Sequence, residues 1–514
     1  MSEDPCNHFD QNVRISALRE EVESAEFPPP TTLVNAHAHT FYSFNYKGYS
    51  PSRFALEAKR QGLEMGGIVD FDVLDGLEEF WAASRLLDLK ACVGIESRVF
   101  VPEFSERVIN SPGEPGISYH MGTGFTTTEI PPEAQSFLDG MRKTSEDRNR
   151  AMVERVNAFL SPLALDYEAD VMPLTPKGNA TERHLCLAYA RKAASDFSDE
   201  SALRAFWGDK LGVAPAELKD LPDGRAMTDL IRAKTMKQGG AGYVQPDSGS
   251  FPNMAEMNEF VLKCGALPTF TWLDGTSDGE QSIEELVEVG RSTGVVVFNI
   301  IPDRNYTPGS PDQKLANLQK VIGLTEELGL PLLGGTEMNS PGQKFVDDFE
   351  CPELSPYHPI FLSGSRILHA HSTLQRLCGM GYLSDWANDQ FAEVRGKNRF
   401  YDEFGAVFFP PPASALSTFR RAFISSPGRS RLKSRPYMNA QHALRAARTN
   451  PSKGICRSLD PIGTSVCQMR ARSPLLSPFL VCGAGAASCL VCAPARPGVV
   501  SAPSLDKILY SKSA

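Results

Sequence analysis

Long apolar runs, a secretory leader and a tight cysteine framework are all missing from this sequence. No uninterrupted apolar stretch is long enough to span a membrane. The first residues, Met1-Ser2-Glu3-Asp4-Pro5, lack a basic segment followed by an apolar one, so we expect no secretory signal. The 11 cysteines are scattered over 514 residues, which is typical of free thiols in a reducing compartment. These absences predict a cytoplasmic protein that does not act at a membrane.

Acidic residues are nearly missing from the end of the chain. Only Asp460 and Asp506 lie in residues 413–514, among many Lys and Arg. The whole chain carries a net charge of −10, so residues 1–412 are more acidic than this total. Negative charge on residues 1–412 repels the phosphate backbone of nucleic acids, so we expect no nucleic-acid partner for this part of the chain.

The 413–514 segment shows no sustained period of 2 or 3.6 and is rich in Arg, Ser, Ala and Pro. Its CxxC pair at Cys489 and Cys492 lacks the second pair that a zinc ribbon needs. A basic tail could bind nucleic acid or an anionic surface. We prefer the interpretation that it is a disordered extension.

Residues 31–410 have an alternating pattern of short apolar runs and helical segments. The length allows two or three domains, or one large α/β domain with additions. Seven or eight βα units favour a closed, TIM-like (β/α) barrel. A doubly wound sheet would usually carry a Gly-rich dinucleotide loop after the first strand, and this loop is missing. Residues 102–240 interrupt the pattern and predict a mainly helical insertion. We expect strands at residues 33–37, 66–70, 91–95, 242–244, 266–272, 295–301, 331–335 and 366–370.

A histidine pair follows the first apolar run. His37 and His39 are two residues apart, and on a strand such residues point to the same side. Two imidazoles aimed at one point favour a metal ion. Such a pair also arises by chance as two buried core histidines.

Further polar residues follow the other expected strands, where barrel enzymes collect functional groups. Asp70, Glu96 and Glu337 are acidic residues of this kind, and His371 follows the last strand. Each also has a structural reading: Asp70 could cap a helix, and Glu96 could form a surface ion pair.

Candidate substrate-binding residues include three cations outside this set of acids. Arg304 is the strongest candidate for an anion, because a guanidinium binds phosphate or carboxylate through two hydrogen bonds. It could instead pair with Asp303. The segment 175–183 could reach a substrate or simply begin a helix. The candidates for substrate binding are Arg304, Lys177, Arg183, Asn339 and Asp274.

Three motifs together resemble the PHP (polymerase and histidinol phosphatase) domain superfamily. They are His37-x-His39, residues 67–76 (GIVDFDVLDG) and residues 94–96 (GIE). This resemblance implies a distorted (β/α)7 barrel that binds one to three divalent ions, commonly Mn, Fe or Zn, and hydrolyses phosphoesters. Glu337 and His371 match the family's later ligands in order. The implied metal ligands are His37, His39, Asp70, Glu96, Glu337 and His371.

The chain departs from the family pattern at several ligand positions. Phe44 and Phe71 stand where a metal-binding residue is usual. The last motif of the family is usually Asp-x-His, and here it is His369-Ala370-His371. The resemblance therefore implies a divergent subgroup with one or two metals, or a site rebuilt around Glu337.

The residues and the resemblance together predict a metal-dependent hydrolase, foremost a phosphoesterase acting on a small anionic molecule. A metal ion would lower the pKa of bound water toward about 7. Asp70, Arg304 and Glu337 are the residues expected to take part in the chemistry. Two alternatives stay open: another metal-dependent reaction (amide or lactone hydrolysis, lyase or isomerase), and a non-catalytic binding module with a decayed metal site.

Overall fold

Seven strands form one continuous sheet in the computed structural model, which describes residues 4–197, 199–246, 248–306 and 312–408. Neighbours in the sheet follow the order of the sequence from β1 to β7. The expectations for residues 413–514 lie outside the described residues. The strands are β1 (Val34–Ala38), β2 (Met65–Phe71), β3 (Lys90–Phe100), β4 (Ile117–Thr123), β5 (Leu267–Trp272), β6 (Val297–Ile300) and β7 (Leu332–Gly334).

The sheet curls into a nearly closed barrel whose first and last strands meet. β4 runs antiparallel to β3 and β5, and the other neighbouring strands pair in parallel. Closure occurs through a parallel bridge between Ala38 and Glu337. Two backbone hydrogen bonds hold it: the Glu337 N–H donates to His37 O at 2.9 Å, and the His39 N–H donates to Glu337 O at 2.7 Å. The seam therefore lies at the histidine pair.

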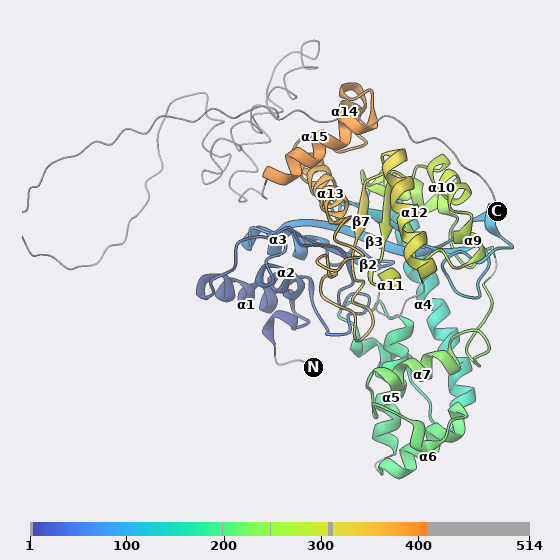
Figure 1. Ribbon diagram of the computed structural model, residues 1–514. Helices are drawn as coiled ribbons and strands as arrows, with labels where there is room; N and C mark the ends of the chain where they lie inside the picture. The colour runs from blue at the N-terminus through green and yellow to red at the C-terminus, as the bar shows by residue number, and fades with distance from the viewer. Residues whose placement is uncertain (1–3, 198, 247, 307–311, 409–514) are drawn as a thin grey trace, which may run out of the picture. The chain divides into compact units, whose positions relative to one another are not determined.

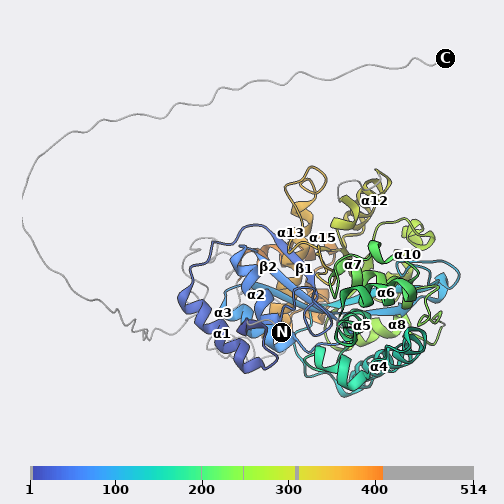
Figure 2. The same ribbon diagram turned by 90° about the horizontal axis from the view of Figure 1, so that it is seen from below.

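Helices pack around the barrel and extend from one end of it (Figures 1 and 2). The ends of α2 follow the sequence rules: the Ser50 side chain accepts from the Arg53 N–H, and Pro51 is the first helical residue. The helices are α1 (Gln11–Ser24), α2 (Pro51–Arg60), α3 (Leu77–Leu86), α4 (Pro132–Leu160), α5 (Glu182–Asp196), α6 (Glu200–Leu211), α7 (Arg225–Thr235), α8 (Met254–Lys263), α9 (Asp278–Gln281), α10 (Ile283–Ser292), α11 (Asp303–Tyr306), α12 (Asp312–Leu328), α13 (His358–Cys378), α14 (Asp385–Gln390) and α15 (Val394–Val407). Within the described residues, no helix is both long and apolar enough to cross a bilayer.

Helices α4 to α7 lie between β4 and β5 in the sequence and enclose a hydrophobic core of their own. Figure 1 shows α5, α6 and α7 gathered together beyond the strands. The long helix α4 belongs to both cores: Leu138 and Met141 pack in the barrel core, and Val153 and Val156 pack in the second. One rigid helix thus joins the helical group to the barrel. We call residues 132–235 the helical lobe.

Three expectations about the strands were wrong. The segment 366–370 lies inside helix α13, and residues 242–244 form no strand. Strand β4 lies within residues 102–240, where we expected mainly helices. Ile367, Leu368 and Ala370 in the segment 366–370 are buried, and so short a run of apolar residues does not distinguish a buried helix from a buried strand.

Candidate metal centre

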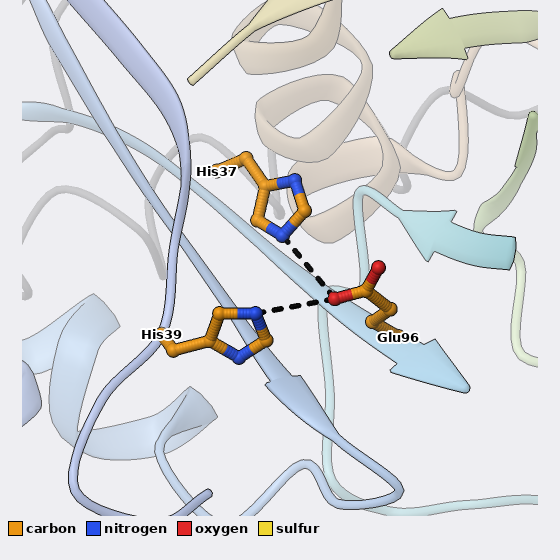
Figure 3. Close-up of side chains that lie close together, drawn as sticks. All are labelled: His37, His39 and Glu96. Atoms are coloured by element: carbon orange, nitrogen blue, oxygen red, sulfur yellow. Dashed lines mark ion pairs between the residues drawn. The ribbon is translucent and has the colours of Figure 1, made fainter. Parts of the chain in front are cut away.

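Three buried side chains from β1, from the residue after it and from β3 meet at one point, with β2 lying between the two strands in the sheet. His37 lies near the end of β1, His39 directly follows β1, and Glu96 lies within β3. Figure 3 shows both rings and the carboxylate directed at one point. Glu96 Oε2 lies 3.4 Å from His37 Nε2 and 3.1 Å from His39 Nε2. Potential ligand atoms of the three residues all lie within 4.8 Å of one another.

The atoms that face each other in this group have no hydrogen-bond partner. His37 Nε2, His39 Nε2 and Glu96 Oε2 are buried and lack one. Burial alone would raise the pKa of Glu96, but the two imidazoles outweigh it and lower the pKa to about 2. Burial would also lower the pKa of His37, and the opposing effect of Glu96 and Glu337 raises it. Unpartnered buried polar atoms are costly, so three converging ones fit a site that could hold a metal ion.

His39 is oriented by two residues behind it. The Ser43 hydroxyl donates to Asp70 Oδ1 at 2.6 Å, so its lone pair accepts from the Nδ1–H of His39 at 3.0 Å. This leaves Nε2 unprotonated and facing Glu96, as a metal ligand requires. Asp70 itself is fixed by Thr40, whose N–H and hydroxyl both donate to it at 2.7 Å.

His37 has an orienting partner on a different strand. Its Nδ1 lies 3.2 Å from the side-chain amide of Asn299 on β6. The Asn299 Oδ1 atom is buried without a partner. If the Asn299 side-chain amide is rotated by 180°, its oxygen accepts from the Nδ1–H of His37. Both groups are then satisfied, and Nε2 of His37 is again available as a ligand.

The donor set and its spacing fit a divalent metal. Ligand bonds of about 2.1 Å at a tetrahedral angle place two ligand atoms about 3.4 Å apart. The two spacings to Glu96 Oε2, 3.1 and 3.4 Å, are close to this value. Two histidines and one carboxylate are typical of catalytic zinc and of iron sites with open positions. Mn, Fe and Zn all accept such ligands.

Glu337 lies beside this group without joining it. Its carboxylate accepts from Arg304 Nη2 at 3.1 Å and from Gln343 Nε2 at 3.0 Å. Burial would raise its pKa, but Arg304, His37 and His39 together outweigh burial and lower it. Its backbone has a left-handed φ of +60° and the next residue, Met338, has one of +55°. Two consecutive residues of this kind store strain at the barrel seam.

The structure does not bring His371 to the metal centre. It lies on α13, where its Nε2 donates to Gly124 O at 3.2 Å and its Nδ1 accepts from the Tyr382 N–H at 2.9 Å. The neighbouring His369 contacts the backbone of Ala91, near the start of β3. Helix α13 therefore covers the barrel end opposite to the metal centre, and both nitrogens of His371 are already used.

A cavity of about 770 Å³ opens above the metal centre, between the barrel and the helical lobe. Phe71 lies on its wall and stacks on His39, with ring centres 4.4 Å apart. Phe44, another wall residue, contacts His184 of the lobe edge to face. Seven cations line the cavity, although the chain as a whole is acidic: Arg98, Arg148, Arg183, Arg225, Arg232, Lys237 and Arg304.

The five expected substrate-binding residues divide into two groups. Arg183, Arg304 and Asn339 line the cavity. Lys177 instead lies 3.6 Å from Asp75, and Asp274 pairs with Lys314 at 2.8 Å; neither contributes to the cavity wall.

Sequence reasoning missed three residues near the site. Arg98 lies two positions after Glu96 on β3, so the alternation of the strand could have revealed it. Ser43 lies one turn after His39 in an irregular loop, and nothing in the sequence marks it. Arg148 is one charged residue among many on α4.

Comparison with known proteins gives limited similarity. No protein-family model matches the chain, and no curated protein matches it. An amidohydrolase structure from Chromobacterium violaceum, with bound sulfate and no metal, is similar at 17% identity and a TM-score of 0.44, covering 62% of this chain and 92% of its own. A structure from Bifidobacterium adolescentis, provisionally assigned as a metal-dependent phosphoesterase, is similar at 16% identity and a TM-score of 0.41, covering 62% and 94%.

Proposed function

We propose that this protein is a metal-dependent hydrolase that cleaves phosphoesters of small anionic molecules. The observation that carries the proposal is the buried His37, His39 and Glu96 group, of which Glu96 lines a cavity that seven cations also line. The group supplies metal ligands, and the cavity supplies charges for an anion. A divalent ion held there would act as a Lewis acid that activates water near neutral pH and polarises a phosphoryl oxygen.

The residues around the metal centre have two roles: some would bind the ion, and others orient those ligands. His37, His39 and Glu96 would hold the ion, and Ser43 and Asn299 keep the imidazoles in the required orientation. Asp70 acts through Ser43, because its contacts to Thr40 and Ser43 engage both carboxylate oxygens. We therefore assign Asp70 as a positioning residue rather than as a direct ligand.

Arg304 is the residue best placed to bind the scissile phosphoryl group. Its Nη2 pairs with Glu337, and the side chain remains 44% exposed toward the cavity. A guanidinium held at one edge by a carboxylate presents its other N–H groups in a fixed direction. Charge that develops on the phosphoryl oxygens is stabilised by such a preorganised donor.

Phosphate release tests this proposal. Full-length protein is stripped of metal, reloaded separately with Mn, Fe(II) or Zn, and supplied with a panel of phosphate monoesters. We expect release that requires the metal and falls strongly in Arg304→Gln. A parallel panel of amides and lactones covers the rival chemistry. Metal-dependent turnover of an amide or lactone, with phosphate release at background, would overturn the phosphoesterase assignment. Absence of turnover in every panel would favour a binding module.

A further inference from the structure

Two arginines in the cavity lie against the same aromatic ring. The guanidinium carbons of Arg98 and Arg148 lie 4.3 and 5.0 Å from the ring centre of Phe251. Arg98 comes from β3, Arg148 from α4, and Phe251 from the segment that returns to the barrel before α8. All three line the cavity. A guanidinium that lies against an aromatic ring keeps its N–H edge available for a planar anion.

The two arginines differ in how their charge is balanced. Arg98 Nη1 pairs with Glu114 at 3.0 Å, and its side chain is only 12% exposed. Among the described residues, no carboxylate lies within ion-pair distance of Arg148, and the only hydrogen bond it donates goes to Ser145, at 3.4 Å. Burial and the nearby charge of Arg98 lower the pKa of Arg148 to about 10, so it stays charged at neutral pH. The carboxylates of Asp72, Glu182 and Glu114 offset part of this charge without forming an ion pair with Arg148. Two like charges close together are stabilised further by a bound anion.

The position of the pair relative to the metal centre fixes the kind of substrate. Arg98 follows Glu96 by two residues on β3, so both point to the same side of the strand, about 7 Å apart along it. Glu96 and both arginines line one continuous cavity. A molecule that reaches the metal centre with one group can therefore reach the arginine pair with another.

We propose that Arg98 and Arg148 form a second anion-binding subsite, which holds a phosphate or carboxylate at the far end of the substrate. This inference rests on the proposed function for the group at the metal centre. It extends that function by naming the substrate class: an elongated molecule with two separated acidic groups, of which the one at the metal centre is cleaved. Phe251 is a positioning residue for both guanidinium groups.

Synthetic probes test the subsite directly. Hexanediol monophosphate, hexanediol bisphosphate and a hexanoate with a terminal phosphate share one chain and differ only at the far end. Wild type is compared with Arg148→Gln and with Lys143→Gln, a matched change on the exposed side of the same helix. Phosphate release gives KM and kcat for each probe. Calorimetric titration with hexane bisphosphonate, which is not hydrolysed, gives affinity without turnover.

We expect Arg148→Gln to raise KM for the bisphosphate, and its Kd for the bisphosphonate, by about tenfold or more, since a hydrogen bond to a charged group contributes about this much. KM for the monophosphate and kcat for both should stay within about twofold, and Lys143→Gln should change neither. A loss for the carboxylate probe as well as the bisphosphate shows that either acid is accepted; a loss for the bisphosphate alone restricts the subsite to phosphate. Arg148→Lys should retain part of the affinity, which distinguishes charge recognition from misfolding.

The two proposals fail in different ways. If Arg148→Gln weakens all three probes equally, or none, the subsite is refuted while phosphate release still supports the hydrolase. If bisphosphonate binding depends on Arg148 but no probe is hydrolysed, the subsite stands and the phosphoesterase assignment falls.

Discussion

The two ends of the barrel handle buried charge in opposite ways. At one end, His37, His39 and Glu96 face each other without hydrogen bonds between the facing atoms. At the other end, Glu64 accepts from Lys90 at 2.6 Å and from Arg366 at 2.8 Å. Paired charges at the second end hold the strands and α13 together, whereas the unpaired atoms at the first end are kept for a ligand. The contrast distinguishes structural from functional polar residues in a barrel where both are buried.

The largest effect is expected at the unpaired end. Glu96→Gln removes the only carboxylate among the three ligands, so metal-dependent phosphate release should fall by more than about a hundredfold, because even orienting partners of ligands contribute 10–100-fold. The free energy of unfolding of the metal-free protein should also fall, because the variant loses the attraction of the two imidazoles that lowers the pKa of Glu96. Turnover assays and denaturant titration measure both. If Glu96→Gln kept its turnover, the group formed by His37, His39 and Glu96 would have no part in the reaction.

Glu64→Gln, at the end of the barrel where charges are paired, should mainly reduce the free energy of unfolding rather than turnover. It removes the carboxylate that contacts both Arg366 and Lys90, whose side chain is 1% exposed. Breaking a buried pair in this way costs about 3–5 kcal/mol of unfolding free energy. Glu21→Gln, which breaks an exposed pair with Arg60, is the matched control and should cost at most about 1 kcal/mol. Equal losses in the two variants would contradict the structural role given to this end.

Ser43→Ala should lower the affinity for metal more than it lowers the stability of the fold. Without the hydroxyl, His39 loses the group that fixes its orientation, and metal affinity should fall by about 10–100-fold. Competition with a chelator of known affinity measures this change. Ser52→Ala, which removes a buried hydroxyl that donates to Glu79, should leave metal affinity unchanged. An unchanged affinity in Ser43→Ala would mean that His39 is held by other contacts.

The smallest expected effect is on how the free energy of unfolding depends on pH, through His371 at the end of the barrel that holds Glu64. Burial lowers the pKa of His371 to about 4, against about 6.5 in an unfolded chain. The unfolded chain therefore binds the proton first as pH falls, and stability present above pH 6.5 is lost progressively below it. His371→Asn should reduce this slope by up to about 1.4 kcal/mol per pH unit. Denaturant titrations of the two proteins across this pH range measure the slopes, and identical slopes would refute this assignment.

The sequence predicted the barrel class because apolar runs and helices alternate over most of the chain. It also identified His37, His39 and Glu96, which the structure brings together, although Glu96 lies within β3 rather than after its end. It failed at His371, because a few apolar residues around Ile367 and Leu368 do not distinguish a buried helix from a buried strand. It missed β4 because an antiparallel strand breaks the βα alternation on which the prediction depended.

The cavity could be predicted only in part. Arg304 and Arg183 were expected to bind an anion, and both line it. Arg148 was not expected, because its proximity to Arg98 depends on how the helical lobe packs above the barrel. Contacts between segments 50 residues apart leave no local pattern in a single sequence.

Elemental analysis of the full-length chain tests the central claim most directly. Wild type, Glu96→Gln and Glu64→Gln are each reloaded with Mn, Fe(II) or Zn, freed of excess metal and measured. The account predicts near-stoichiometric metal in wild type and in Glu64→Gln, and background levels in Glu96→Gln. Wild type without bound metal, or Glu96→Gln with as much metal as wild type, would contradict it.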